Sequence, residues 1–119
     1  MISLAALAEL HDRHRADLDL PVHPVTVADG VVVRDGRVTV MGAVNLSRDS
    51  TYRESVAVST ESAVRMARVQ AAQGASIVDL GAEASGQRAG RASPGEQLDK
   101  LLPVVETLAH ELVLSVEIY

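Results

Sequence analysis

Three short apolar runs alternate with two longer amphipathic stretches over residues 38–119. The apolar runs are Val38–Ser50, Ser76–Ser85 and Val113–Tyr119, and they are rich in Val, Leu, Ile and Ala, as buried parallel strands are. Each run has polar groups at or beyond its carboxyl end, namely Asn45 and Asp49, Asp79 and Glu83, and Glu117. Strand, helix, strand, helix and strand in this order predict an α/β fold, the N-terminal portion of a TIM (β/α)8 barrel.

The two stretches between the predicted strands have helix start and stop signals. Ser59 or Thr60 is suited to cap the first helix and Gly74 to end it. Ser93-Pro94-Gly95-Glu96 is a capping box with proline at the first helical position of the second helix, and Pro103 predicts a kink there. Apolar side chains at helical spacing predict the face of this second helix that packs on the sheet. They are Leu98, Leu101, Leu102, Val105, Leu108, Ala109 and Leu112.

The first 37 residues follow a different pattern. Ser3–Leu18 is amphipathic and predicts a helix that Pro21 and Pro24 end. Val25–Val40 holds two Asp-Gly pairs between short valine runs, which predicts a β-hairpin that leads directly into a first barrel strand at Thr39–Val44. We therefore divide the chain into an extension of helix and hairpin, residues 1–37, and a partial barrel, residues 38–119.

Loop lengths indicate where a functional site would lie. The two long connections, Leu46–Val58 and Gly81–Ala92, both follow strands, whereas Gly74-Ala75 and Glu111-Leu112, which precede strands, are short. Long loops in compact domains are usually functional, and in a parallel barrel the loops after the strands hold the active site. The asymmetry predicts a site at the carboxyl edge of the sheet.

Composition excludes several classes of protein. The chain has 119 residues, a formal net charge of −5 and no run of Lys and Arg, which argues against nucleic acid or an anionic membrane as a partner. It has no cysteine, which excludes disulfides and thiolate metal sites and fits a cytoplasmic protein. The first ten residues lack a basic region and include Glu9, so we expect neither a signal peptide nor a membrane span.

The order of residues around the predicted strands carries a resemblance. Val40–Ser50, VMGAVNLSRDS, resembles the first signature of dihydropteroate synthases, and Ala75–Ser85, ASIVDLGAEAS, resembles the second. Leu102–Val105 is similar to a helix segment of that family, and Ser115–Glu117 to its third barrel strand. The resemblance covers Thr39–Tyr119, about two-thirds of the chain.

This resemblance implies a pterin-binding transferase of folate biosynthesis, which joins a dihydropterin pyrophosphate to para-aminobenzoate with the help of Mg²⁺. Asn45 matches the amide that holds the metal and pyrophosphate, and Asp49 matches an aspartate near the para-aminobenzoate subsite. Glu117, one methylene longer than the family's aspartate, matches the carboxylate that binds the pterin ring by parallel hydrogen bonds. Asp79 and Glu83 match positions that organise the site. The implied partner is a small-molecule pterin, and a homodimer of a full-length parent is left open.

The second loop departs from the family pattern. Its usual Ser-Thr-Arg-Pro-Gly is replaced by Ala84–Arg88, so the arginine that meets an anionic substrate is missing at Gly86. Arg88 or Arg91 is left to supply a cation, and we take Ser85 and Arg88 as the substrate-binding candidates of this loop.

Two further interpretations stay open beside the transferase. One is a pterin-binding methyltransferase domain that uses a folate methyl donor. The other is a non-catalytic, degenerate pterin-fold binding protein, which the changes at Gly86, Gln87 and Glu117 favour. A complete barrel has eight strands and the chain supplies three. We therefore read the resemblance as truncated after the third strand and expect the 119-residue chain alone to be inactive.

Overall fold

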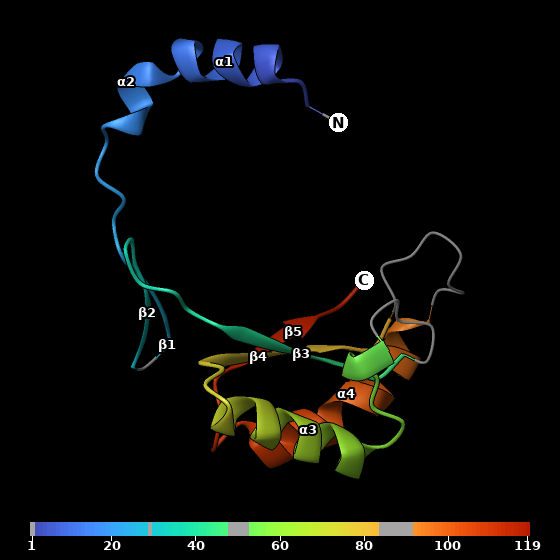
Figure 1. The fold of residues 1–119 in the computed structure, drawn as a ribbon. Helices are drawn as coiled ribbons and strands as arrows, with labels where there is room; N and C mark the ends of the chain where they lie inside the picture. The colour runs from blue at the N-terminus through green and yellow to red at the C-terminus, as the bar shows by residue number, and fades with distance from the viewer. Residues whose placement is uncertain (1, 29, 48–52, 84–91) are drawn as a thin grey trace.

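The central feature of the structure is a three-stranded parallel sheet, seen in a computed structural model that describes residues 2–28, 30–47, 53–83 and 92–119 (Figure 1). The strand order is β3 (Met41–Asn45), β4 (Ile77–Gly81) and β5 (Leu114–Glu117), all parallel. Helix α3 (Thr60–Ala72) joins β3 to β4, and α4 (Pro94–Leu108) joins β4 to β5. This is the predicted start of a barrel, although each strand begins one or two residues later than the sequence indicated.

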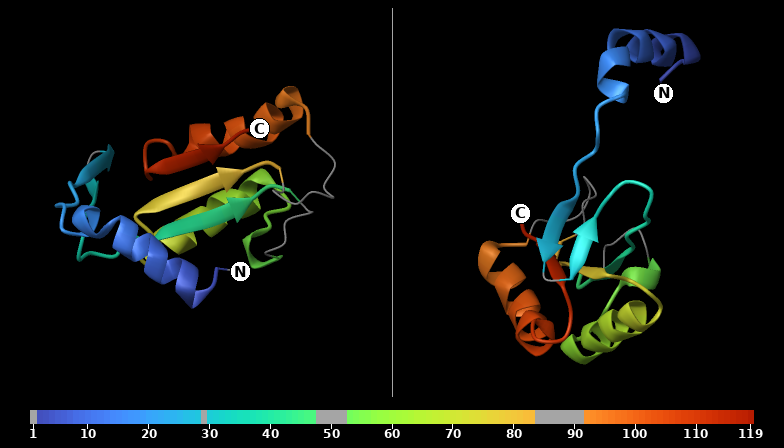
Figure 2. Two further views of the ribbon diagram at one scale, coloured as in Figure 1. Left: turned by 90° about the horizontal axis from the view of Figure 1, so that it is seen from above. Right: turned by 90° about the vertical axis from the view of Figure 1, so that its left-hand side faces the viewer.

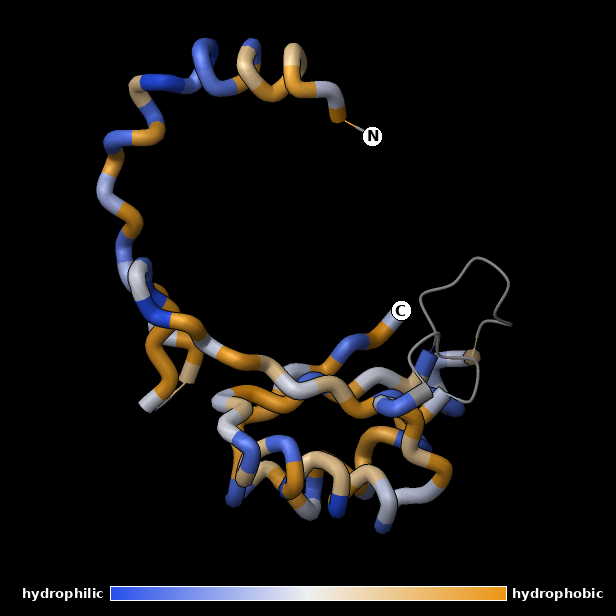
Figure 3. Tube along the Cα trace, viewed as in Figure 1, coloured by the Kyte–Doolittle hydropathy of each residue, from blue (hydrophilic) through white to orange (hydrophobic). Residues whose placement is uncertain are grey.

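Both connecting helices cover the same face of the sheet, and no helix of the described residues packs on the opposite face, which we call the open face (Figures 1 and 2). Hydrophobic residues occur along the strands and in both helices (Figure 3), and a cluster of them forms the core. Burial of these small aliphatic groups is the main source of stability, since the hydrophobic effect scales with the apolar area removed from water. The core consists of Val44, Ala57, Ala63, Val64, Ala67, Val78, Leu80, Ala82, Leu101, Val104 and Leu108.

The predicted helix ends are confirmed. The Ser59 hydroxyl accepts a hydrogen bond from the Ser62 N–H at 3.2 Å and caps α3. Gly74 follows the helix with φ of 108°, a conformation that side chains rarely adopt. At α4, the Ser93 N–H donates to Glu96 Oε2 at 2.8 Å, and the Ser93 hydroxyl accepts from the Glu96 N–H. These caps satisfy backbone groups that a helix end leaves unpaired.

The predicted packed face of α4 is partly wrong. Leu98 and Leu102 are 53% and 51% exposed, whereas the buried line of this helix is Gln97, Leu101, Val104 and Leu108. The apolar face of α4 is wider than the part of the helix that contacts the sheet. Periodicity therefore predicted a buried line about one residue away from the observed one. Helix α4 runs on through Pro103.

The outer edge of β3 is covered by neighbouring segments of the chain. The Ala43 carbonyl accepts a hydrogen bond from Gln70 Nε2 at 2.9 Å, and the Asn45 carbonyl accepts one from the Ala57 N–H at 2.7 Å. Gly42 permits this approach, because a Cβ at that position would lie 2.3 Å from Gln70 Oε1. The Gln70 side chain and the Ala57 backbone thus supply hydrogen bonds to carbonyls that would be unpaired at the edge of the sheet.

The amino-terminal region stands apart from the sheet (Figure 1). The single predicted helix is two, α1 (Leu4–Arg13) and α2 (Arg15–Leu18), and neither buries a residue. Strands β1 (Val25–Ala28) and β2 (Val31–Val33) form the expected antiparallel pair. Residues 34–40 contain no strand, so the expectation that the hairpin leads directly into the barrel is wrong. The division at residue 37 stays a prediction.

None of the helices in the described ranges is both long enough and apolar enough to cross a membrane.

Candidate functional site at the carboxyl edge of the sheet

Asn45, Gly81 and Glu117 form one row across the ends of the three strands. Asn45 is paired in register with Gly81, and Gly81 with Glu117. Partners in register share a face of a sheet, and side chains alternate along each strand. A Cβ on Gly81 would lie 3.2 Å from Asn45 Oδ1 and 3.6 Å from Glu117 Oε2. The two side chains therefore flank Gly81 on the face away from the helices, as we predicted for Glu117.

Asn45 is held by the segment that follows the first loop. Its Nδ2 donates to the Ser55 hydroxyl at 2.7 Å, and Ser55, in the short 3-10 helix η1 (Arg53–Ser55), is buried. Because the amide nitrogen points to Ser55, the Oδ1 oxygen is turned toward Gly81. The fold thus presents a carbonyl oxygen of fixed orientation at the edge of the sheet.

Glu117 is held by a tyrosine. The Tyr119 hydroxyl donates to Glu117 Oε1 at 2.5 Å, while Oε2 lies on the side of Gly81. This hydrogen bond raises the pKa of the Tyr119 phenol, and desolvation and the negative charges of Glu117, Glu83 and Asp79 act in the same direction. The carboxylate is otherwise exposed and accessible from the open face.

Gln97 and Glu83 connect the two ends of the second loop. Glu83 Oε2 accepts hydrogen bonds from the Ala92 N–H at 3.2 Å and from Gln97 Nε2 at 3.4 Å. The Gln97 amide nitrogen also donates to the carbonyls of Ala92 and Tyr119, at 3.1 and 3.0 Å. These contacts join the residues on either side of the second loop, and the role of Glu83 in organising the site stays a prediction.

The sequence interpretation missed Gln97 and Tyr119. Gln97 is 1% exposed and stands at helical spacing before Leu101, Val104 and Leu108. A glutamine at the spacing of a helix's apolar residues could have been recognised as a buried polar group, and such a group needs hydrogen-bond partners. Nothing in the local sequence marks the contact of Tyr119 with Gln97, because that partner comes from α4, whereas Glu117 stands only two residues before Tyr119.

The other predicted site residues divide into two groups. Asp49, Ser85 and Arg88 lie outside the described residues. Asp79 lies in β4, two residues before Gly81, and is paired in register with Ala43 and Ser115. It is half-buried.

The carboxylates at this edge suit a ligand that donates hydrogen bonds. Within the described ranges, no group of three or more His, Asp and Glu side chains is arranged to hold a metal ion. A metal here would depend on Asn45 and on ligands from the substrate, so the metal assignment of Asn45 stays a prediction.

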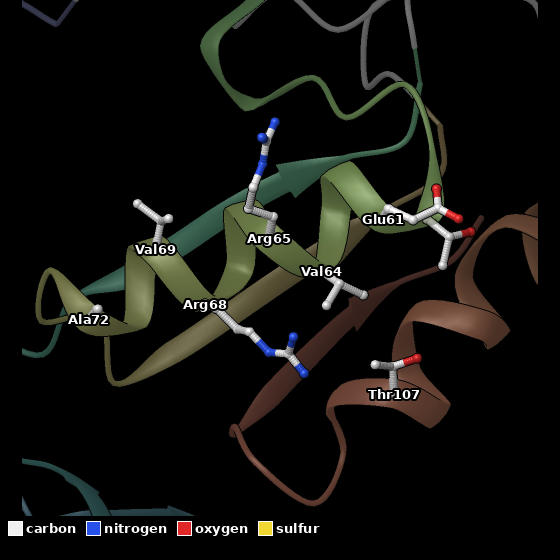
Figure 4. Close-up of a pocket in the computed structure, with 8 residues that line it drawn as sticks. Glu61, Val64, Arg65, Arg68, Val69, Ala72 and Thr107 are labelled. Atoms are coloured by element: carbon white, nitrogen blue, oxygen red, sulfur yellow. The ribbon is translucent and has the colours of Figure 1, made fainter.

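Of the hollows in the part of the chain that the structure describes, one lies beside the row and another on the helices. A cavity of about 400 Å³ beside the edge of β3 is lined by Ala43, Asn45, Glu54, Ser55 and Gln70. A groove of about 620 Å³ lies on the helix layer, where Arg65, Arg68 and Val69 of α3 project from the outer surface and Thr107 of α4 lies opposite (Figure 4). The lining of the groove includes none of the residues of the row, and we place the candidate site at the row.

Comparisons with known proteins identify the family. Residues 41–118 match the family described as pterin binding enzyme. The mitochondrial folate synthesis bifunctional protein of Pisum sativum is 39% identical over 82 residues, which are 69% of this chain and 16% of that protein.

Solved structures give the same result. A Yersinia pestis dihydropteroate synthase in complex with a sulfonamide drug superposes with a TM-score of 0.70 and 32% identity, covering 81% of this chain and 35% of that one. A Coxiella burnetii dihydropteroate synthase in complex with pteroic acid has a TM-score of 0.62 and 29% identity, covering 80% and 34%.

The chain belongs to the family of pterin-binding enzymes, and its relatives named above are dihydropteroate synthases and a folate synthesis protein. The fold is thereby that of a TIM barrel, of which the described residues form three strands. The chain spans about a third of the length of the enzymes in those solved structures and about a sixth of the pea protein.

Proposed function

We propose that the chain supplies the first three strands of a dihydropteroate-synthase-like transferase, which condenses a dihydropterin pyrophosphate with para-aminobenzoate in folate biosynthesis. The observation that supports this most is the row of Asn45, Gly81 and Glu117 on the open face of the sheet. An amide oxygen and a carboxylate oxygen lie on either side of a residue without a side chain, and the proposed ligand would contact both.

Glu117 is the proposed pterin-binding residue. An amino-pyrimidine edge presents parallel N–H donors, and a carboxylate accepts two such bonds with geometric selectivity. The Glu117 side chain is exposed on the open face, and its Oε2 is directed to the row. Since Oε1 already accepts from Tyr119, the pterin would share that oxygen through its second lone pair.

Asn45 fits a magnesium-assisted reaction. Mg²⁺ prefers oxygen ligands and usually combines one or two protein groups with phosphate oxygens and water. Asn45 Oδ1 is such an oxygen, and its amide is oriented by Ser55. When bound, the metal would neutralise charge on the departing pyrophosphate. Asn45 would orient that end of the substrate, while Glu117 holds the ring.

The loops complete the proposal. Asp49 would lie near the para-aminobenzoate subsite, and Ser85 and Arg88 would contact the anionic substrate from the second loop. The hydrogen bonds that Glu83 accepts from the Ala92 N–H and from Gln97 support the role of the second loop, because they hold its two ends at the edge of the sheet. We also propose that residues 1–37 are an extension to the barrel.

A cytoplasmic location and a homodimer of a longer parent belong to the same proposal. The cysteine-free composition supports a reducing compartment. The pea relative is described as mitochondrial, so cell fractionation would distinguish cytosol from organelle.

Equilibrium dialysis with 6-hydroxymethylpterin tests the proposal. We expect the 119-residue chain to bind the pterin, Glu117→Gln to reduce the affinity about tenfold or more, and Glu106→Gln to leave it unchanged. Glu106 is an exposed glutamate on α4 and serves as the matched control. Loss of a charged hydrogen-bond partner costs ~1.5–3 kcal/mol, which corresponds to the expected change.

The same experiment separates the rival interpretations. Pterin binding without condensation in a longer form of the protein would favour a non-catalytic binding protein. Condensation in that form would favour the transferase. Absence of pterin binding by wild type, with a folded chain verified by circular dichroism, would contradict the proposed site.

A further inference from the structure

Tyr119 stands between the candidate ligand-binding carboxylate and the buried amide of α4. Its hydroxyl donates to Glu117 Oε1 at 2.5 Å, and its backbone is bonded on both sides to one side chain. The Tyr119 N–H donates to Gln97 Oε1 at 3.2 Å, and the Tyr119 carbonyl accepts from Gln97 Nε2 at 3.0 Å. A paired contact of this kind fixes both the position and the direction of the backbone.

Gln97 can hold that backbone because Gln97 itself is immobilised. It is 1% exposed, lies in the first turns of α4, and its Nε2 is also within hydrogen-bond distance of the Ala92 carbonyl and of Glu83 Oε2. A buried glutamine whose oxygen and nitrogen are both engaged has one well-defined orientation. The start of α4 is therefore connected rigidly to the residues beyond β5.

The Glu117 side chain would be flexible without a hydrogen-bond partner. Its side chain has three rotatable bonds, sits at the end of an edge strand, and is exposed. An unsupported glutamate would lose rotamer freedom on binding a ligand. The hydrogen bond from Tyr119 restricts those rotamers before a ligand arrives, which is preorganisation of the site.

We propose that Tyr119, clamped by Gln97, is a positioning residue that holds the Glu117 carboxylate in its ligand-binding orientation. This rests on the proposed function for the identity of the ligand, a pterin. The contact itself is independent of it. Tyr119 would act through Glu117 and would not need to touch the ligand.

The phenol of Tyr119 reports on the contact directly. The sequence has two tyrosines, Tyr52 and Tyr119, so a Tyr52→Phe background leaves one phenol to titrate by its absorbance near 295 nm. The hydrogen bond to Glu117 raises the pKa of Tyr119 from its usual value of 10.0, and Glu83 and Asp79 are the other charged groups that act on it. We expect Glu117→Gln to lower the titration midpoint toward 10, while Glu106→Gln leaves it in place.

The contact between Gln97 and Tyr119 is tested in the same Tyr52→Phe background. Gln97→Met keeps the length of the side chain and removes both hydrogen bonds, so the midpoint should fall as Tyr119 moves away from Glu117. Gln73→Met, at an exposed glutamine beyond the end of α3, is the matched control and should have no effect. Circular dichroism verifies that each variant is folded. If Gln97→Met does not fold, the Tyr119→Phe measurements decide the question.

Affinity for 6-hydroxymethylpterin supplies the functional readout. Tyr119→Phe should weaken binding about threefold to tenfold, the range expected for loss of one hydrogen bond. In a Glu117→Gln background the same change should have no further effect, since the two residues act as one unit.

Two results would overturn the inference. One is a Tyr119 titration that does not respond to Glu117→Gln. The other is an equal effect of Tyr119→Phe on affinity whether or not Glu117 is present. If wild type binds no pterin, the proposed function fails, and the titrations alone decide whether Gln97 and Tyr119 position Glu117.

Discussion

Gly81 is the residue on which the geometry of the candidate site depends most directly. Any side chain there would enter the space between Asn45 Oδ1 and Glu117 Oε2, at 3.2 and 3.6 Å from its Cβ. Gly81→Ala should therefore displace one or both groups. We expect pterin affinity to fall several-fold, while the free energy of unfolding changes by less than about 1 kcal/mol, because alanine also restricts the unfolded chain.

Gly95→Ala is the matched control for this prediction. A Cβ at Gly95 meets nothing within 4 Å, and the residue lies in the first turn of α4. Alanine there should raise the free energy of unfolding by up to about 1 kcal/mol and leave the affinity unchanged. Urea titration and equilibrium dialysis measure the two quantities. Equal pterin affinities for wild type and Gly81→Ala would show that the ligand does not use this row.

Asn45 allows a separate test of the metal assignment. Asn45→Ala removes the Oδ1 oxygen and should weaken Mg²⁺-dependent binding of pyrophosphate about tenfold, as loss of one charge-assisted contact does. Asn45→Asp keeps an oxygen at that position and should retain Mg²⁺-dependent binding. Calorimetry with and without Mg²⁺ measures both. An unchanged affinity in Asn45→Ala would contradict a metal role for Asn45.

Residues differ in how far their roles can be read from the sequence. Asn45 and Glu117 stand at the ends of apolar runs and could be selected from their position. Gln97 and Tyr119 could not be paired, because residues 22 apart in the chain form their two hydrogen bonds. Contacts of that kind depend on how α4 lies against β5, which no local pattern specifies.

At the scale of elements, an ion pair connects α3 to the turn after α4. Arg68 donates from Nε and an amino nitrogen to the two carboxylate oxygens of Glu111, at 2.9 and 2.6 Å. The hydrogen bonds from Arg68 lower the pKa of the Glu111 carboxyl from its usual 4.5. The backbone hydrogen bonds at the amino ends of the two helices lower the pKa of Glu61 and of Glu96 in the same direction.

These shifts predict loss of stability in acid. A carboxyl whose folded pKa lies below its unfolded pKa contributes stability above the unfolded value, and this contribution is lost as the pH falls through the folded pKa. The urea midpoint should therefore fall as the pH is lowered from about 5 to 3. Glu111→Gln should show a smaller fall over that range, whereas Glu106→Gln should match wild type. An identical pH profile for Glu111→Gln would mean that the ion pair does not contribute.

Helix boundaries were predictable because caps are local. The Ser59 cap, Gly74 and the box from Ser93 to Glu96 each depend on residues within one turn. The buried side of α4 was not predictable in detail, because Leu98 and Leu102 are as apolar as the residues that face the sheet. Tertiary packing chose between two overlapping apolar faces.

At the scale of the whole molecule, the sheet has one covered face and one open face. The open side carries Met41, which is 57% exposed, and Val116 in the edge strand β5 and Ile118 just beyond it are exposed. Unpaired strand edges and apolar patches template association. We expect the 119-residue chain to self-associate at micromolar concentration. Analytical ultracentrifugation measures this, and a monomer with a sharp cooperative thermal transition would contradict it.

The parallel sheet and its helices could be predicted from the sequence. The arrangement of the amino-terminal region could not. Alternation of strands with capped helices determines a parallel sheet with the helices on one face. The helices α1 and α2 bury no residue, so the amphipathic pattern of Ser3–Leu18 indicates a helix without indicating what it packs against. Residues 34–40 separate the hairpin from β3 because they form no strand, although Val38–Val40 is strand-like in composition.

The central claim is that a pterin binds to the row of Asn45, Gly81 and Glu117, and a crystal structure with 6-hydroxymethylpterin tests it most directly. We predict electron density for the ring on the open face of the sheet, with its amino-pyrimidine edge within hydrogen-bond distance of the Glu117 carboxylate. Density in the groove lined by Arg65, Val69 and Thr107 on the helix layer, with the row empty, would contradict the account.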